Sequence, residues 1–388
     1  MQVVVFYALY GFFLYSFSVS CYSEYVKLDS ICAFSLYCER AEKSIERGVI
    51  MKKSIVISAL LFVLCAGIWA AEKNAPKSPW DFSVTTDFAY YPKSAYKSGS
   101  SGTSHFAPIT GIYSGLEFRV TGTAGYTIPV PFGKNALVKD NKLRFYADFE
   151  LSPVSLAPAL GVSFTPIAFL NFSAGTSIGA AWDFIGIQGL AKWDPLKYDE
   201  NLKKSGSYES LPFKSARWDA WFQGALMFDL AAVVPGDWNH VITYNSYKAM
   251  YRGITSGGEN GNPWLYQGSG EKINGWQYEA NFILGYQMPI VLQTVAVQAE
   301  LSGQYNGKKD FAERYHKAEP DFMNVSISPI LLFKFGKKDA LTTQFQFSSR
   351  RRFAKEYTKS KEMFIDDLNF TGREWYFNRI ALSYKHSF

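Results

Sequence analysis

The sequence predicts an all-β chain, a closed antiparallel transmembrane β-barrel of about twelve strands over residues 80–388. Apolar and polar residues alternate over long stretches, and the connections between these stretches are long and short in turn. Aromatic residues are abundant, with 25 Tyr and 32 Phe in 388 residues. A period of two that persists over ten residues indicates strands, and no helical period competes with it. The mean hydropathy of −0.08 excludes a bundle of apolar membrane helices.

The residues before the predicted barrel divide into three segments, 1–50, 51–71 and 72–79. Residues 51–71 have a basic start, a short apolar stretch and small residues at the end, which predicts a secretory signal peptide. Cys65 keeps a lipoprotein anchor open as the alternative. Residues 72–79 are expected to form a short polar linker.

Residues 1–50 are expected to be an upstream extension, with the translation start at Met51. The stretch 3–20 is apolar and nearly long enough to span a membrane, so an amino-terminal helix is the alternative. All four cysteines precede residue 72, at Cys21, Cys32, Cys38 and Cys65. The predicted mature chain therefore has no disulfide, thiol nucleophile or cysteine-based metal site.

Twelve strands follow from the alternation of apolar and polar residues. In 142–152, for example, the odd-numbered positions are apolar and the even-numbered positions are polar or charged. The range 154–182 carries no charge, but its prolines and glycines would break a helix, so it predicts two strands around a turn at Pro166. The predicted strands are 81–90, 112–129, 142–152, 156–165, 169–182, 217–234, 239–252, 276–287, 295–302, 324–335, 341–350 and 375–388.

The connections between these strands fall into two classes. Short ones are expected near residues 130–141, 165–168, 235–238, 288–291 and 336–339, and long ones at 92–111, 183–215, 253–274, 306–321 and 353–372. Short turns on one side of a membrane and long loops on the other are typical of bacterial barrels. Closure is required because lipid cannot satisfy the hydrogen bonds of a free strand edge.

The last predicted strand, 375–388, is apolar on one face and ends with an aromatic residue. Its apolar face carries Ile380, Leu382, Tyr384 and the terminal Phe388. This strand resembles the carboxyl-terminal strand of bacterial outer-membrane β-barrel proteins, a porin-like superfamily. The resemblance implies a location in the bacterial outer membrane, contact with outer-membrane lipid, and recognition of the strand by the barrel-insertion machinery.

The inward polar faces supply the candidate pore residues. They are Arg119, Arg144, Asp148, Glu150, Arg217, Asp219, Glu279, Glu300, Lys334, Arg350 and Arg379. Enclosed charges are costly unless they pair, so a closed, salt-bridged interior is one interpretation and a narrow pore with opposed acidic and basic walls is the other. We expect a channel for passive diffusion of small hydrophilic solutes. The alternative is a surface adhesin or structural barrel that binds a partner through its long loops.

One wall of the lumen is predicted to be lined by small, uncharged residues. The strands 156–165 and 169–182 present mainly alanine, serine and glycine inward, including Gly175 and Gly179. Small residues in a strand often mark the close approach of another segment. We expect the longest loop, 183–215, to fold inward against this wall, and a wider lumen with the loop outside is the alternative.

Nothing in the chain predicts catalysis or cofactor binding. The one Gly-x-Ser-x-Gly pattern, at 175–179, lies inside the predicted strand 169–182 and not at a turn from a strand to a helix, and the four histidines, His105, His240, His316 and His386, are far apart in the sequence. We expect no enzymatic activity, no cofactor and no metal. The net charge of +6 is too mild to indicate a nucleic-acid partner.

Overall fold

The computed structural model describes residues 78–95, 106–130, 133, 137–138, 141–199, 204–354 and 369–388. The predicted segments 1–50 and 51–71 lie outside the described residues, as does the linker 72–79 apart from Ser78 and Pro79. Most of the predicted loop 353–372 lies outside them as well.

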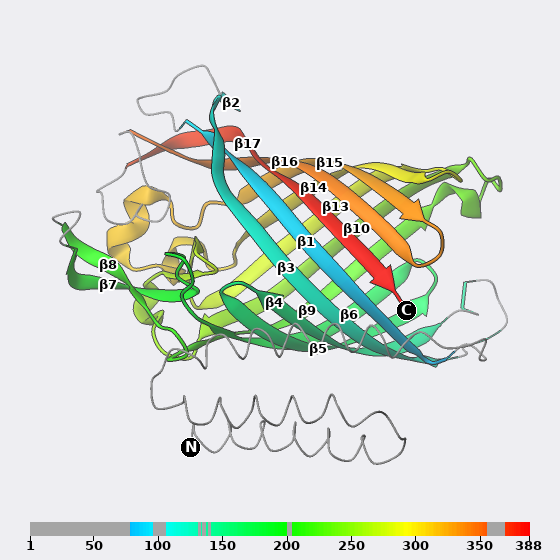
Figure 1. The fold of residues 1–388 in the computed structure, drawn as a ribbon, viewed down its shortest axis with the longest axis horizontal. Helices are drawn as coiled ribbons and strands as arrows, with labels where there is room; N and C mark the ends of the chain where they lie inside the picture. Colours follow the sequence, from blue (N-terminus) through cyan, green and yellow to red (C-terminus); the bar gives the residue numbers. More distant parts are fainter. Residues whose placement is uncertain are drawn as a thin grey trace, which may run out of the picture. The chain divides into compact units, whose positions relative to one another are not determined.

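Twelve long strands form one closed antiparallel barrel (Figure 1). Each strand pairs with the next long strand along the chain, and the last pairs with the first. The twelve predicted strands are confirmed, most of them within three residues at each end. They are β1 (Trp80–Ser94), β3 (Ile109–Pro129), β4 (Lys142–Ser152), β5 (Ser155–Ile167), β6 (Leu170–Ala181), β9 (Ala216–Asp229), β10 (His240–Ile254), β13 (Gly275–Gln287), β14 (Leu292–Gln304), β15 (Asn324–Phe335), β16 (Asp339–Phe353) and β17 (Phe370–Ser387).

The barrel closes between β17 and β1. The pairing runs from Ser83 opposite Ser387 to Tyr90 opposite Ile380. Beyond it, the two-residue strand β2 (Phe106–Ala107) pairs in parallel with β17 at the level of Trp375. This closure leaves no free sheet edge along the membrane-spanning part of the wall.

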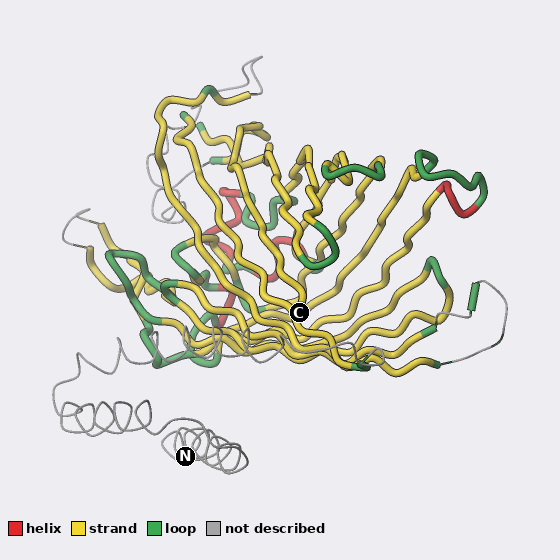
Figure 2. Tube along the Cα trace, turned by 45° about the vertical axis from the view of Figure 1, so that its right-hand side comes forward, coloured by secondary structure: helices red, strands yellow, loops and turns green. Residues whose placement is uncertain are grey.

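The two ends of the barrel differ, as the connection lengths predict. One end carries the short turns and the carboxyl terminus, and the other carries the long connections (Figures 1 and 2). The predicted strand 217–234 ends early, at Asp229, because residues 230–232 form the short helix η2 (Leu230–Ala232). The Asp229 carboxylate caps this helix by accepting a hydrogen bond from Ala231 N at 3.0 Å.

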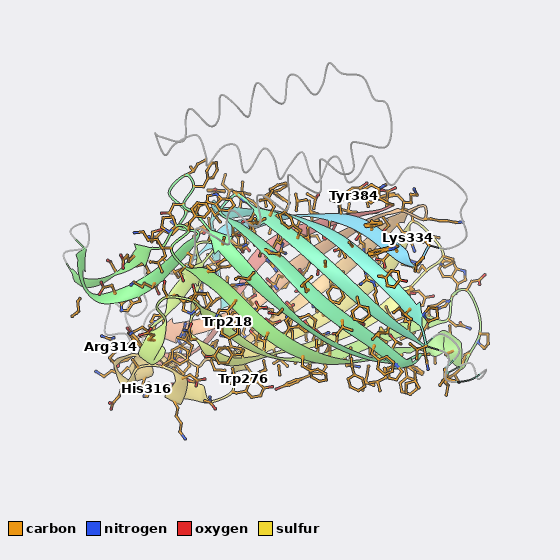
Figure 3. The ribbon with its side chains drawn as sticks, turned by 90° about the horizontal axis from the view of Figure 1, so that it is seen from below. Trp218, Trp276, Arg314, His316, Lys334 and Tyr384 are labelled. Atoms are coloured by element: carbon orange, nitrogen blue, oxygen red, sulfur yellow. The ribbon has the colours of Figure 1, made fainter. Side chains whose placement is uncertain are left out.

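The outer face of the barrel is apolar. Large side chains around it are exposed to the surroundings, among them Phe82, Phe118, Phe145, Leu160, Phe282 and Leu284. Trp218 and Trp276 lie toward the long-loop end and Tyr384 toward the short-turn end, where aromatic belts meet the membrane surfaces (Figure 3). Because a soluble protein does not expose so continuous an apolar surface, this face contacts lipid. The described residues contain no helix that is long and apolar enough to span a membrane.

Replacing a lipid-facing residue by arginine tests this orientation. Phe282→Arg is expected to destabilise the barrel by about 2–4 kcal/mol, because arginine near the lipid midplane is costly. Ile283→Arg is the matched control, because the next side chain of β13 points into the lumen. Denaturant titration of the barrel in vesicles measures both. Equal losses of stability would contradict the assignment of the two faces.

Candidate pore constriction

The middle of the lumen is lined by ion pairs between strands that are adjacent or separated by a single strand. Arg119 on β3 lies with its Nε 3.1 Å from Asp87 on β1 and its Nη1 3.4 Å from Glu150 on β4. Arg379 on β17 pairs with Glu117 on β3 at 3.5 Å. These side chains stay about a quarter to a third exposed, although they point into the barrel. The pairs therefore lie along the wall and remain accessible from the lumen.

A second ion-pair network lies on β9, β10 and β13, nearer the long-loop end. Asp219 is its centre, with Arg217 Nη2 at 2.9 Å and Arg252 Nε at 3.8 Å. Glu279 lies 3.9 Å from Arg252 and 3.7 Å from Lys248. The Asp219 and Arg217 side chains are far less exposed than those at mid-barrel. The lumen is thus more enclosed at this level.

The other predicted pore residues are spread over the wall. Their side-chain partners are Asp81 for Arg144 (2.5 Å), Thr123 for Asp148 (2.6 Å), Gln346 for Glu300 (3.0 Å) and Glu374 for Arg350 (2.8 Å). Lys334 is exposed at the short-turn end. The structure thus brings Arg119 together with Glu150, and Arg217 together with Asp219. Arg252 links Asp219 to Glu279. The other predicted pore residues do not join these two groups.

Three charged wall residues escaped the sequence-based prediction: Lys248, Arg252 and Glu374. Lys248 and Arg252 stand on the same face of β10 as Ser246, which faces the lumen. Their even-numbered spacing within the predicted strand 239–252 could have revealed them. Glu374 lies just before the predicted start of the last strand, which begins five residues earlier in the structure, at Phe370.

A hairpin from the connection between β10 and β13 enters the barrel. It consists of β11 (Trp264–Tyr266) and β12 (Ser269–Lys272), and we call it the inner hairpin. Its turn residues, Gln267 and Gly268, have φ angles of 54° and 67°. Two consecutive positive φ angles make the tight reversal that suits a two-residue hairpin.

The tip of the inner hairpin reaches the wall a quarter to a third of the way around the barrel from β10. Gln267 Nε2 donates to Ser155 Oγ on β5 at 2.9 Å and to Glu150 Oε1 on β4 at 3.2 Å. These strands are three and four positions from β10, where the connection begins. Because both ends of the connection are fixed at β10 and β13, the hairpin crosses the lumen and narrows it.

The small-residue wall makes room for this hairpin. A Cβ atom added at Gly179 would lie 2.7 Å from Tyr266 Oη, so no larger residue fits without displacing the ring. The Arg217 guanidinium lies over the Tyr266 ring, 4.8 Å from its centre. The prediction that small residues mark the approach of another segment is confirmed, but the segment is Tyr266 of the inner hairpin.

The prediction that loop 183–215 folds inward is therefore wrong. This loop forms a separate hairpin of β7 (Leu190–Asp199) and β8 (Lys204–Ser210), which we call the outer hairpin. Its base pairs with β11, at Lys192 opposite Trp264, and its far part stands away from the barrel (Figure 1). The physical reason is that Leu190 and Leu211, the apolar residues at the base of this loop, pack against Trp264 and Tyr266 of β11.

An apolar core holds the inner hairpin in place. It contains Ala181, Leu190, Leu211, Ile254, Trp264 and Tyr266, all less than 6% exposed. The Trp264 indole also donates from Nε1 to Asn274 Oδ1 at 3.0 Å. A segment that buries this much apolar surface is fixed, because its release would expose these side chains to water.

Lys272, at the end of the inner hairpin, interacts electrostatically with charged groups on β9, β10 and β13 and with Glu117 on the more distant strand β3. Enclosure, together with the nearby Arg252 and Arg217 guanidinium groups, lowers the pKa of Lys272 to about 7, whereas Glu279 and Glu117 act in the opposite direction. Glu117 on β3 and Arg252 on β10 are five strands apart in a barrel of twelve. A side chain that interacts with both lies in the interior of the barrel.

The described part of the chain contains no cluster of His, Cys, Asp and Glu that could hold a metal ion. Its histidines lie apart: His240 contacts Asp229, His386 contacts Asp339, and His316 contacts the Phe311 carbonyl oxygen. His105 lies outside the described residues.

The predicted assembly signal lies on the strand that closes the barrel. Leu382 and Tyr384 are exposed on its outer face, and Ile380 shares that face. Phe388 donates its backbone N–H to Phe82 O on β1 at 3.0 Å, and its ring packs edge-on against His386 at 4.7 Å. The residues of the predicted signal therefore belong to the seam of the barrel.

The closed barrel, its apolar exterior and its unequal ends define the class: this chain is a β-barrel protein of the bacterial outer membrane. No protein-family model matches it, and no curated protein matches its sequence. Solved barrels resemble it in fold alone. An outer-membrane channel from Pseudomonas putida F1 is 12% identical, with 82% of this chain and 98% of that chain covered and a TM-score of 0.37.

Two further structures show the same level of likeness. The KdgM porin is 10% identical, with 79% of this chain and 99% of that chain covered and a TM-score of 0.29. The translocator domain of the autotransporter NalP from Neisseria meningitidis is 9% identical, with coverage of 87% and 96% and a TM-score of 0.32. Likeness this low carries no activity from these proteins to this chain.

Replacing Gly179 tests the seat of the inner hairpin. Gly179→Leu is expected to push Tyr266 away and to expose the hairpin tip, because the new side chain needs the space of that ring. The control is Gly122→Leu on the outer face of β3, where an added Cβ meets nothing within 4 Å.

A cysteine at position 267 reports the change. Labelling of Gln267→Cys by a membrane-impermeant maleimide should become faster in the Gly179→Leu background and stay unchanged with Gly122→Leu. An unchanged labelling rate with Gly179→Leu would show that the hairpin does not rest on this wall.

Proposed function

We propose that this barrel is a channel for passive diffusion of small hydrophilic solutes, with the inner hairpin as its constriction. The observation that supports it most directly is the exposure of the charged residues at mid-barrel. Arg119, Asp87 and Glu150 point inward, yet 25–34% of each side chain remains exposed. A lumen filled by packed side chains would bury them.

The arrangement of the charges supports the same proposal. The pair Arg119–Asp87 joins adjacent strands, and the pair Arg379–Glu117 joins β17 and β3, which are separated by β1 alone. They stabilise the charges without bridging the lumen, and they leave donors and acceptors turned toward it. A hydrated polar path lets a small solute exchange part of its water shell for these groups.

The rival function, a surface adhesin, is favoured by the outer hairpin. It stands away from the barrel, and Leu196 on β7 is 89% exposed. The outer hairpin lies outside the lumen, so partner binding through it is compatible with passage of solutes through the barrel.

We propose further that the protein is not an enzyme, because passive diffusion through a polar lumen requires no catalytic group.

Removing the constriction is expected to raise conductance. In planar bilayers the wild-type barrel should give discrete current steps, and replacing residues 264–272 by Gly-Ser-Gly should make these steps severalfold larger. Replacing residues 194–207 of the outer hairpin is the control and should leave them unchanged. Absence of steps at any voltage would contradict the channel and favour the adhesin.

We also propose that the barrel-insertion machinery recognises the terminal strand. Deleting Phe388 is expected to leave unfolded protein in the periplasm, because the seam loses its last backbone hydrogen bond and its terminal ring. Ser387→Ala is the control, since it changes the adjacent inward-facing side chain alone. Heat-modifiable migration of the outer-membrane fraction measures folding, and normal amounts of folded truncated barrel would refute the proposal.

A further inference from the structure

The lumen carries an excess of positive charge where the inner hairpin crosses it. Arg217, Lys248 and Arg252 line the wall there, and Lys272 comes from the hairpin itself. The carboxylates of this described network are Asp219 and Glu279. With Glu117, which faces Lys272 from β3, four cations face three carboxylates among the described residues, and the Arg217, Asp219 and Arg252 side chains are less than one-fifth exposed.

The arginines of this cluster keep donors without an acceptor. Arg217 donates from Nη2 to Ser177 Oγ at 2.6 Å, and the same nitrogen lies 2.9 Å from Asp219 Oδ2. The Nε atoms of Arg217 and Arg252 are both buried and have no hydrogen-bond partner in the described part of the chain. A buried donor without an acceptor is unfavourable, so both groups would gain from an anionic oxygen at this position.

Lys272 completes the cluster from the side of the hairpin. It stands opposite Trp264 in the inner hairpin, whose Tyr266 ring lies 4.8 Å from the Arg217 guanidinium, and none of the ion pairs among the described residues includes it. Asp219 and Glu279 offset the charges of Arg217 and Arg252, but the charge of Lys272 adds to theirs in an enclosed space and favours a further counter-charge. Their arrangement around a lumen gives that counter-charge a route of entry.

We propose that Arg217, Arg252 and Lys272 form a binding site for small anions that present carboxylate or phosphoryl oxygens. The site gives the proposed channel a preference for anionic solutes, and this part of the inference rests on the proposed function. Guanidinium groups suit such oxygens because they offer several donors in one plane, and the ammonium group adds a mobile point charge.

The charge state of Lys272 sets the pH range of the site. The charged groups facing it are Arg252 on β10, Arg217 on β9, Glu279 on β13 and Glu117 on β3. Because its lowered pKa is about 7, the ammonium form prevails below that pH and is lost above it. A bound anion favours the ammonium form, so anion affinity should fall as the pH rises from 6 to 8.

Calorimetric titration of the folded barrel in detergent with inorganic phosphate, and separately with acetate, tests the site without requiring conduction. Lys272→Gln is expected to weaken binding of both anions about tenfold at pH 6, since one charge-assisted contact is lost, and to remove the pH dependence of acetate binding, because acetate itself does not titrate between pH 6 and 8. Lys272→Arg keeps the charge and should keep binding. Lys337→Gln, in an exposed turn at the other end, is the control for the same change in net charge.

Reversal potentials in a salt gradient then test the consequence for transport. The wild type and Lys337→Gln should prefer chloride over potassium, and Lys272→Gln should lose that preference. A conducting barrel with equal anion affinity in Lys272→Gln and Lys337→Gln would overturn the site and leave the channel intact. Anion binding without any conductance would overturn the channel and leave the site.

Discussion

The structure depends on one constraint: a strand that crosses lipid must find all its backbone hydrogen-bond partners within the protein. The pairing of β17 with β1 meets it, because it converts an open sheet of twelve strands into a closed wall. With the wall closed, each strand has an inner and an outer face. The apolar exterior and the polar interior follow from the alternation of side chains along the strands.

The same constraint explains which parts of the structure the sequence predicts. The strands and the order of long and short connections were predicted because a period of two is a local pattern, visible in any ten residues. The ion pair of Arg119 with Glu150 was within reach, since both residues stand on inward faces of adjacent strands. Arg252 and Lys248 escape prediction because apolar and polar residues alternate less regularly in 239–252 than in the other strands, so the pattern does not mark the inward positions clearly.

The inner hairpin could not be predicted in the same way. Its position depends on contacts between residues far apart in the chain, such as Gln267 with Ser155 and Tyr266 with Gly179. The small residues of β5 and β6 predict the close approach of another segment, but the sequence of these strands does not show which loop supplies it. That choice is made by the apolar core, in which Trp264 and Tyr266 of the inner hairpin pack with Leu190 at the base of the outer hairpin.

The pairing and the partial exposure of the charged side chains explain how the lumen can be stable and, in the proposed channel, remain open to small solutes. At mid-barrel the ion pairs lie along the wall and stay accessible, so their desolvation is partial. At the inner hairpin the groups are more enclosed, and positive charge exceeds negative charge. In the proposed channel, the hairpin therefore forms a short region in which the charge of the solute matters.

The crossing of the lumen by the inner hairpin is the central claim, and chemical crosslinking tests it most directly. The chain after residue 71 contains no cysteine, so in a barrel produced from residue 72 onward Gln267→Cys with Ser155→Cys introduces the sole pair of thiols. A short bismaleimide should join this pair in the folded barrel and should fail to join Leu196→Cys with Ser155→Cys. Crosslinking of position 196 in place of position 267 would show that the outer hairpin fills the lumen, and would contradict the account.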